Sequence, residues 1–145
     1  MPEKETRERA EEDKREGKAA STQAGEYVHE EIKHVRKGKH GARSTKQAIA
    51  IGLSKARRAG VKLPAKKGTS KRTRKQAARD LRKGKSGGGK TSAKRSRATL
   101  KALKHEGGKA ASKEALSRQA RAAAKRRSAA SRSRAAKKAA RTRKK

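Results

Sequence analysis

The sequence predicts a mostly α-helical protein with extensive disorder, in which a short helical hairpin is followed by low-complexity basic helices. Two observations predict this class. Six Leu, three Ile and three Val are the large aliphatic residues among 145, and Phe and Trp are absent. A chain this poor in large apolar side chains is typical of disordered proteins. Alanine is abundant, however, and because it has the highest helix propensity we expect helices with little core between them.

Charge divides the chain into segments. Through Glu31 there are 10 acidic and 6 basic residues, whereas the remaining 114 residues carry 3 acidic and 41 basic ones, for a net charge of +34. We expect a mixed-charge head over residues 1–20, a hairpin over 21–64 and a Lys/Arg/Ala-rich tail over 65–145. The head segment from Glu3 to Glu16 has no apolar stripe, so we expect a solvated, fraying helix that ends near Gly17.

The first helix of the hairpin is predicted from Tyr27 to Lys37. Val28, Ile32 and Val35 follow at i, i+4 and i+7, which places them on one face of a helix. Gly38 then stands where a helix commonly ends, because glycine readily adopts the left-handed conformation of a C-terminal cap.

The second helix of the hairpin is predicted from Thr45 to Ala59. Ser44 and Gln47 have the spacing of a capping box, in which side chain and backbone exchange hydrogen bonds at a helix start. Small and apolar residues recur on one face of this helix, and Gly60 fits a C-terminal cap in which Val61 contacts Ala56. The hairpin buries too little apolar surface to offset the entropy of ordering it, so we expect a partner: a second copy, giving a homodimer, or a nucleic-acid surface.

Glycine breaks divide the tail into three helix candidates. They run near Ser70 to Lys83, Ala93 to Glu106 and Ser112 to Arg143. Like charges at i, i+4 oppose helix formation in free solution, so we expect these segments to become helical mainly when phosphates neutralise them.

Two patterns resemble sites of known chemistry. The segment from Gly84 to Thr91 matches the phosphate-binding pattern GxxxxGK[ST], but no buried strand precedes it, so we interpret it as a flexible cationic linker. His29 and His34 are five residues apart and point in different directions on a helix, so they cannot share a metal from one face. His40 and His105 stand alone among cations, and there is no Cys. We therefore expect no catalytic residues, no cofactor and no metal, and no enzyme.

The density of cations predicts binding to nucleic acid. A segment with 41 cations in 114 residues repels itself unless a polyanion compensates the charge. Tyr27 is the sole aromatic residue, so platforms for stacking bases are absent. Contacts to phosphate carry no sequence information, and we expect sequence-tolerant binding in which duplex DNA is favoured and RNA is an alternative.

Three groups of residues are predicted to contact phosphates. At the start of the second helix, backbone amides and nearby cations form either an anion site or an ordinary capped turn, and the sequence leaves both open. The predicted contacts are Lys39, His40, Arg43 and Lys46 at this start, Lys55, Arg57 and Arg58 along the helix, and Arg118, Arg121, Lys125, Arg126 and Arg127 in the tail.

The block KHGARSTKQAIAIGLSKARRAG, which begins at Lys39, resembles an uncharacterised family of small basic bacterial proteins, some of which are labelled plasmid stabilisation protein. The tail is similar in composition to linker-histone-like bacterial chromatin proteins. These resemblances imply a chromatin-related or plasmid-related role.

The combined expectation is a nucleoid-associated or DNA-protecting protein. An RNA- or ribosome-associated protein and a plasmid-maintenance module with a protein partner are the alternatives. The N-terminus has no apolar stretch, and no run approaches the roughly 20 apolar residues that span a bilayer. We therefore expect a cytoplasmic location at the nucleoid and no membrane partner.

Overall fold

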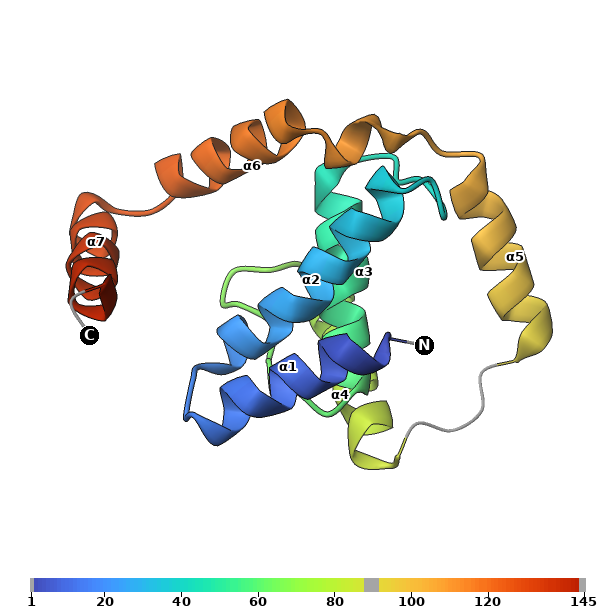
Figure 1. Ribbon diagram of the computed structural model, residues 1–145, viewed down its shortest axis with the longest axis horizontal. Helices are drawn as coiled ribbons and strands as arrows, with labels where there is room; N and C mark the ends of the chain where they lie inside the picture. The colour runs from blue at the N-terminus through green and yellow to red at the C-terminus, as the bar shows by residue number, and fades with distance from the viewer. Residues whose placement is uncertain (1, 88–91, 144–145) are drawn as a thin grey trace.

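The computed structural model describes residues 2–87 and 92–143, and within them the chain forms seven α-helices, one 3₁₀-helix and no strand (Figure 1). The predicted helical class is confirmed. The predicted extensive disorder is not supported, because ordered helices continue through the described part of the tail. The elements in order are α1 (Lys4–Arg15), α2 (Ala20–Arg36), α3 (Thr45–Arg58), α4 (Lys71–Lys85), α5 (Ala93–Lys104), η1 (Gly108–Ala111), α6 (Lys113–Lys125) and α7 (Ala129–Arg143).

The predicted hairpin forms the centre of the fold, where α2 and α3 pack side by side (Figure 1). Its first helix starts at Ala20, earlier than the predicted Tyr27. The two helices approach closely at Gly52: a Cβ atom there would lie 2.7 Å from the Cα atom of Val28. Glycine at this position therefore allows backbone-to-backbone packing, which partly replaces the large apolar side chains that the sequence lacks.

The ends of the hairpin helices follow the sequence signals. Gly38 and Gly60 adopt φ values of 69° and 99°, and the N–H of Val61 donates to the carbonyl of Ala56 at 3.1 Å, as the predicted C-terminal cap requires. At the start of α3, Ser44 Oγ accepts a hydrogen bond from the N–H of Gln47 at 3.2 Å. The predicted cap residues are confirmed.

Helix α1 packs one face against α2 and exposes the remainder to solvent. Ala10 and Thr6 are buried, and Ala10 contacts the cluster that contains Tyr27 and Ala56. The buried carboxylate of Asp13 pairs with Lys18 Nζ at 2.8 Å. The predicted helix and its end near Gly17 are confirmed. The docked face was not predicted, because small residues, and not a stripe of large apolar ones, form it.

Helix α4 packs against the other side of the hairpin, on α3. Ala77 and Asp80 are buried, and Gly84 lies so close that a Cβ atom there would overlap the carbonyl oxygen of Arg57. These residues stand at i, i+3 and i+7, which places them on one face of a helix. Asp80 accepts hydrogen bonds from Ser54 Oγ and Arg58 Nε, each at 2.8 Å.

The segment η1 closes the remaining end of the hairpin. Ala111 is fully buried in a cluster with Ile32 and Val35, and its carbonyl accepts a hydrogen bond from Arg36 Nε at 2.8 Å. The loop before α3 is also fixed, because Thr45 Oγ1 donates to the carbonyl of Ala110 at 2.6 Å. The partner that the hairpin needs is therefore supplied by α1, α4 and η1 of the same chain, so the packing no longer calls for a homodimer.

The last predicted helix is two helices in the structure. Helices α6 and α7 are separated at residues 126–128, and Ser128 Oγ accepts from the N–H of Ser131 at 3.2 Å. The prediction of one helix from Ser112 to Arg143 was wrong because a serine cap starts a new helix without any Gly or Pro. Helix α7 buries none of its residues and stands away from the centre in Figure 1. No described helix combines the length and apolar character that a membrane span requires.

The segment that matches the phosphate-binding pattern does not follow a strand. Gly84 and Lys85 form the end of α4, and Gly87 adopts a φ of 71° in the turn that follows. Residues 88–91, which include Lys90 and Thr91, lie outside the described residues. A pattern that begins inside a helix lacks the strand that positions a nucleotide phosphate.

Candidate nucleic-acid interface

In the folded chain, few acidic side chains that follow Glu31 are exposed. Three acidic residues follow Glu31: Asp80 is 1% exposed, Glu106 is half-buried and only Glu114 is exposed. Helices α5 and α7 contain no acidic residue, and the one acidic residue of α4 points inward. The exposed charges of α4, α5 and α7 are therefore all positive.

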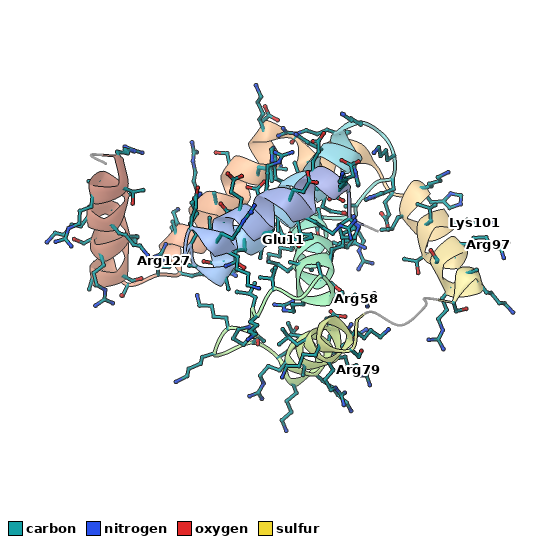
Figure 2. The ribbon with its side chains drawn as sticks, turned by 60° about the horizontal axis from the view of Figure 1, so that its bottom comes forward. Glu11, Arg58, Arg79, Arg97, Lys101 and Arg127 are labelled. Atoms are coloured by element: carbon teal, nitrogen blue, oxygen red, sulfur yellow. The ribbon has the colours of Figure 1, made fainter. Side chains whose placement is uncertain are left out.

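Helix α4 holds the densest of these charges on a fixed support. Its contact face binds α3 through Ala77 and Asp80, and at roughly 100° per residue Lys71, Lys75 and Arg79 lie on the opposite side. Figure 2 shows the α4 side chains, Arg79 among them, directed away from α3. All eight cations of the helix are exposed: Lys71, Arg72, Arg74, Lys75, Arg79, Arg82, Lys83 and Lys85.

The dimensions of α4 suit a duplex backbone. Its 15 residues extend roughly 22 Å at about 1.5 Å per residue, and duplex DNA carries about 13 phosphate charges over that length of axis. Because Asp80 and Gly84 hold the helix on α3, its cations can meet phosphates without ordering a new helix. These residues are not among the contacts predicted from the sequence, although the segment is visibly dense in Lys and Arg.

The predicted tail contacts are exposed. Arg118, Arg121 and Lys125 lie on α6, and Arg126 and Arg127 lie in the link to α7. Arg97 and Lys101 on α5 are also exposed and lie on the other side of the molecule from Arg127 in Figure 2. The labelled cations of α5 and of the link between α6 and α7 thus lie on opposite sides of the molecule.

At the start of α3, the structure separates the predicted contacts. Arg43 and Lys46 are exposed. Lys39 Nζ, in contrast, lies 2.8 Å from Glu3 Oε1. The hydrogen bond from Lys39, followed by that from His34, holds the pKa of the Glu3 carboxyl at about 2. The ammonium group of Lys39 therefore forms an ion pair with a carboxylate of its own chain.

His40 and Lys55 face inward. The side chain of His40 is 10% exposed, and its Nε2 lies 3.3 Å from Glu31 Oε1. Lys55 Nζ lies 2.6 Å from Glu31 Oε2. Since Glu31 is fully buried, these two side chains lie against an internal carboxylate and are not available to contact phosphates.

The two arginines at the end of α3 also have internal partners. Arg57 Nε donates to the carbonyl of Leu63 at 2.7 Å, and Arg58 Nε donates to Asp80. Arg58 keeps 42% of its side chain exposed. Both residues fix the surroundings of α3, and the guanidinium of Arg58 is shared between Asp80 and solvent.

The start of α3 is a satisfied capped turn. Ser44 Oγ accepts from Gln47, and Gln47 Oε1 accepts in turn from the N–H of Arg43 at 2.7 Å. The loop also donates to the tail, because the N–H of Ala42 bonds the carbonyl of Gly107 at 3.1 Å. Of the two interpretations open from the sequence, these contacts favour the capped turn over an anion site.

Comparison with known proteins gives one match. Residues 12–67 match a family of unknown function (DUF6496). The matched segment extends from α1 through α3 to the loop before α4, and it contains the block that begins at Lys39. This agrees with the expected likeness to an uncharacterised family, whereas the plasmid-stabilisation label stays a prediction. Neither the curated proteins nor the solved structures contain a match to this chain.

Proposed function

We propose that this protein binds the phosphate backbone of duplex DNA without sequence preference, as a nucleoid-associated or DNA-protecting protein in the cytoplasm. The observation that carries the proposal is the all-positive exposed charge of α4, α5 and α7. In particular, the folded chain turns Asp80, the one carboxylate of α4, into its interior. A surface of this kind attracts a polyanion and has no exposed acid of its own to compete with it.

The arrangement favours contact with the backbone over contact with bases. Tyr27 is 2% exposed, so the sole aromatic ring of the chain is not available to stack on a base. Long, flexible Lys and Arg side chains on an exposed helix face bond phosphate oxygens in any sequence. Binding should therefore depend strongly on salt and weakly on sequence.

The test is the salt dependence of binding by the full chain. Each phosphate that is neutralised contributes about −0.9 to the slope of log K against log salt on duplex DNA. We expect a slope steeper than about −3, with similar affinities for unrelated duplex sequences. A slope shallower than this would exclude broad engagement of the tail.

A pair of matched variants tests the role of α4. Lys71, Lys75 and Arg79 are replaced by Gln in one variant, and Lys4, Lys14 and Arg15 of α1, also exposed, are replaced by Gln in the control. Both variants lose three positive charges. We expect the α4 variant to reduce the slope by about 2 to 3 and the control by less than about 1. Equal reductions would show that net charge, and not the α4 face, governs binding.

Competition with structured RNA at fixed salt separates DNA from RNA as the target. We expect duplex DNA to displace RNA, because the proposed contacts follow a regular duplex backbone. Preferential retention of RNA would instead support a ribosome- or RNA-associated protein.

A further inference from the structure

Two histidines and a glutamate meet at the end of α2, on the opposite side of α3 from the phosphate-binding surface proposed on α4. Glu31 and His34 lie in the last two turns of α2, and His40 lies in the following loop. Gly38 adopts a φ of 69°, and the N–H of Lys39 donates to the carbonyl of His34 at 3.0 Å. This turn reverses the chain and returns His40 to the helix.

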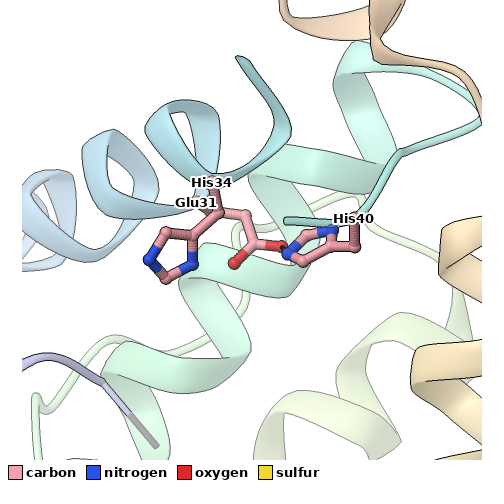
Figure 3. Close-up of side chains that lie close together, drawn as sticks. All are labelled: Glu31, His34 and His40. Atoms are coloured by element: carbon pink, nitrogen blue, oxygen red, sulfur yellow. Dashed lines mark ion pairs between the residues drawn. The ribbon is translucent and has the colours of Figure 1, made fainter. Parts of the chain in front are cut away.

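The three side chains form a compact set of ligand atoms. One oxygen of Glu31 and one ring nitrogen from each histidine lie within 4.8 Å of one another. Figure 3 shows both rings beside the carboxylate, and the ring planes are nearly perpendicular, with centroids 6.1 Å apart. His40 stands alone in the sequence, because its approach to Glu31 depends on the glycine turn and not on helical spacing.

The outer nitrogen of each ring is held by an acceptor. His34 Nε2 lies 2.9 Å from the carboxylate oxygen Oε1 of Glu3, and His40 Nδ1 lies 3.1 Å from the carbonyl oxygen of Gly41. Neither acceptor can donate, so each outer nitrogen carries the proton of its ring. The inner nitrogens are Nε2 of His40, which lies 3.3 Å from Glu31 Oε1, and Nδ1 of His34, which lies 3.9 Å from Glu30 Oε1. In the neutral ring each of them has a lone pair that can bind a metal ion. Outer-ring hydrogen bonds of this kind orient metal-binding histidines in proteins.

Glu31 is a buried carboxylate that lies close to Lys55 and His40 but accepts no hydrogen bond. It is 0% exposed, and neither of its oxygens has a contact with hydrogen-bond geometry. Lys55 Nζ lies near Oε2, at 2.6 Å, and 3.5 Å from Oε1 of the buried Glu30. One ammonium group thus serves two buried carboxylates, and beside it these carboxylates have only the rings of His34 and His40 as titratable neighbours that can carry positive charge. A buried charge of this kind is costly unless a cation compensates it.

We propose that Glu31, His34 and His40 bind a divalent zinc ion. The ligands are Glu31 Oε1, His34 Nδ1 and His40 Nε2, while Lys55 holds the second carboxylate oxygen. Two imidazoles and one carboxylate form a common ligand set for Zn²⁺, with the fourth position open to water. A polar hollow of about 210 Å³ lies next to the cluster and is lined by His34 and Glu30.

The site would stabilise the turn between α2 and α3. Two of its ligands come from α2 and the third from the loop, so the ion connects the end of one helix to the start of the next. Metal binding of this kind adds to folding stability, because the site exists only in the folded chain. The zinc site and the proposed DNA contacts use different residues, so an experiment can refute either proposal without refuting the other.

The experiment measures zinc binding by the untagged full chain, purified in high salt to remove nucleic acid and stripped with chelator. We expect one Zn²⁺ per chain by elemental analysis after dialysis, and a higher melting temperature with zinc than with chelator. Co²⁺ should give the absorption bands of a tetrahedral or five-coordinate ion. No stoichiometric ion after dialysis would overturn the proposal.

The chain contains four histidines and no Cys, so it provides its own control. We expect His34→Gln and His40→Gln each to weaken zinc binding at least about 100-fold. Glu3→Ala should weaken it about 10- to 100-fold by removing an outer hydrogen bond. The control variant combines His29→Gln with His105→Gln and should bind as the original chain does. Loss of binding in the control, or retention in both single variants, would overturn the assignment.

A measurement on the unaltered chain covers the case in which a variant does not fold. Nitrogen NMR of the imidazole rings should show the proton on Nε2 of His34 and on Nδ1 of His40, with zinc shifting the other nitrogen of each ring. An imidazolium at His40 that persists when zinc is added would show that the histidine, and not a metal, compensates Glu31.

Discussion

Gly52→Ala should destabilise the fold, although alanine is normally the better helix residue. In an exposed helix interior this substitution gains about 1 kcal/mol. Here the new Cβ atom would lie 2.7 Å from the Cα atom of Val28 and 3.0 Å from the carbonyl oxygen of Tyr27. Ordinary contacts begin at 3.4 Å, so the backbones of α2 and α3 must separate by about 0.7 Å.

The size of the effect follows from that separation. A gap of this width forfeits roughly a quarter to a half of the dispersion energy of each contact that it opens. Overpacking typically costs about 1 to 3 kcal/mol, and we expect the upper end because the atoms that must move belong to the backbone. After the gain in helix propensity, the free energy of unfolding should fall by about 2 kcal/mol, or roughly 6 to 8 °C in melting temperature.

The matched control is Gly25→Ala. Gly25 is an exposed glycine of α2, and a Cβ atom there meets nothing within 4 Å. This variant should be about 1 kcal/mol more stable than the original chain. Thermal and urea unfolding followed by circular dichroism compares the two. If Gly52→Ala is as stable as Gly25→Ala, α2 and α3 do not pack as the structure shows.

Three further predictions concern the same core. Burial raises the pKa of Tyr27, so absorbance should show the phenol ionising above the ordinary pKa of about 10. Because the folded chain holds the phenol proton more tightly, the contribution of Tyr27 to stability is lost as pH rises from that value through the folded pKa. An ordinary pKa in the absence of urea would contradict the burial. Asp80→Ala should lower the free energy of unfolding by about 1 to 3 kcal/mol, because it removes the partner of Ser54 and Arg58. Hydrogen exchange should then show faster exchange of the α4 amides, and unchanged protection in α4 would contradict its docking on α3. Ser44→Ala should cost about 1 kcal/mol by chemical denaturation through loss of the α3 cap, and a neutral effect would indicate that Gln47 alone secures the turn.

The sequence signals predicted helix ends better than helix contacts. Ser44, Gly38 and Gly60 each have a local mechanism, a side-chain cap or a positive φ, that acts within a few residues. The hairpin was therefore predictable, apart from the early start of α2. The break before α7 was missed because Ser128 is one of many serines in the tail, and a single serine does not identify a cap.

The core was underestimated because counting large apolar residues assumes that such residues do the packing. In this structure Ala10, Ala56 and Ala111 are buried, and glycines allow neighbouring backbones to approach closely. Small residues bury less area each, but close helix approach increases the dispersion contacts that the backbone itself makes. In a basic, low-complexity segment, the sequence does not distinguish alanine and glycine residues that pack from those that are exposed. The docking of α4 and η1 therefore could not be predicted from the sequence.

Acidic residues show most clearly how the fold and the proposed functions are connected. An acid in a cationic segment would weaken phosphate binding if it stayed at the surface, and Asp80 avoids this because it is the group that docks α4. The same holds in α2, where burial of Glu30 and Glu31 removes two negative charges from the exterior and creates the polar interior at which the histidines converge. In a chain with a net charge of +34, four buried carboxylates in the described part of the chain thus act as internal anchors for cations: Asp13, Glu30, Glu31 and Asp80. Replacing Asp80 with a neutral residue should consequently have two opposed effects, a looser α4 and a locally more positive surface, so DNA affinity should change less than stability does.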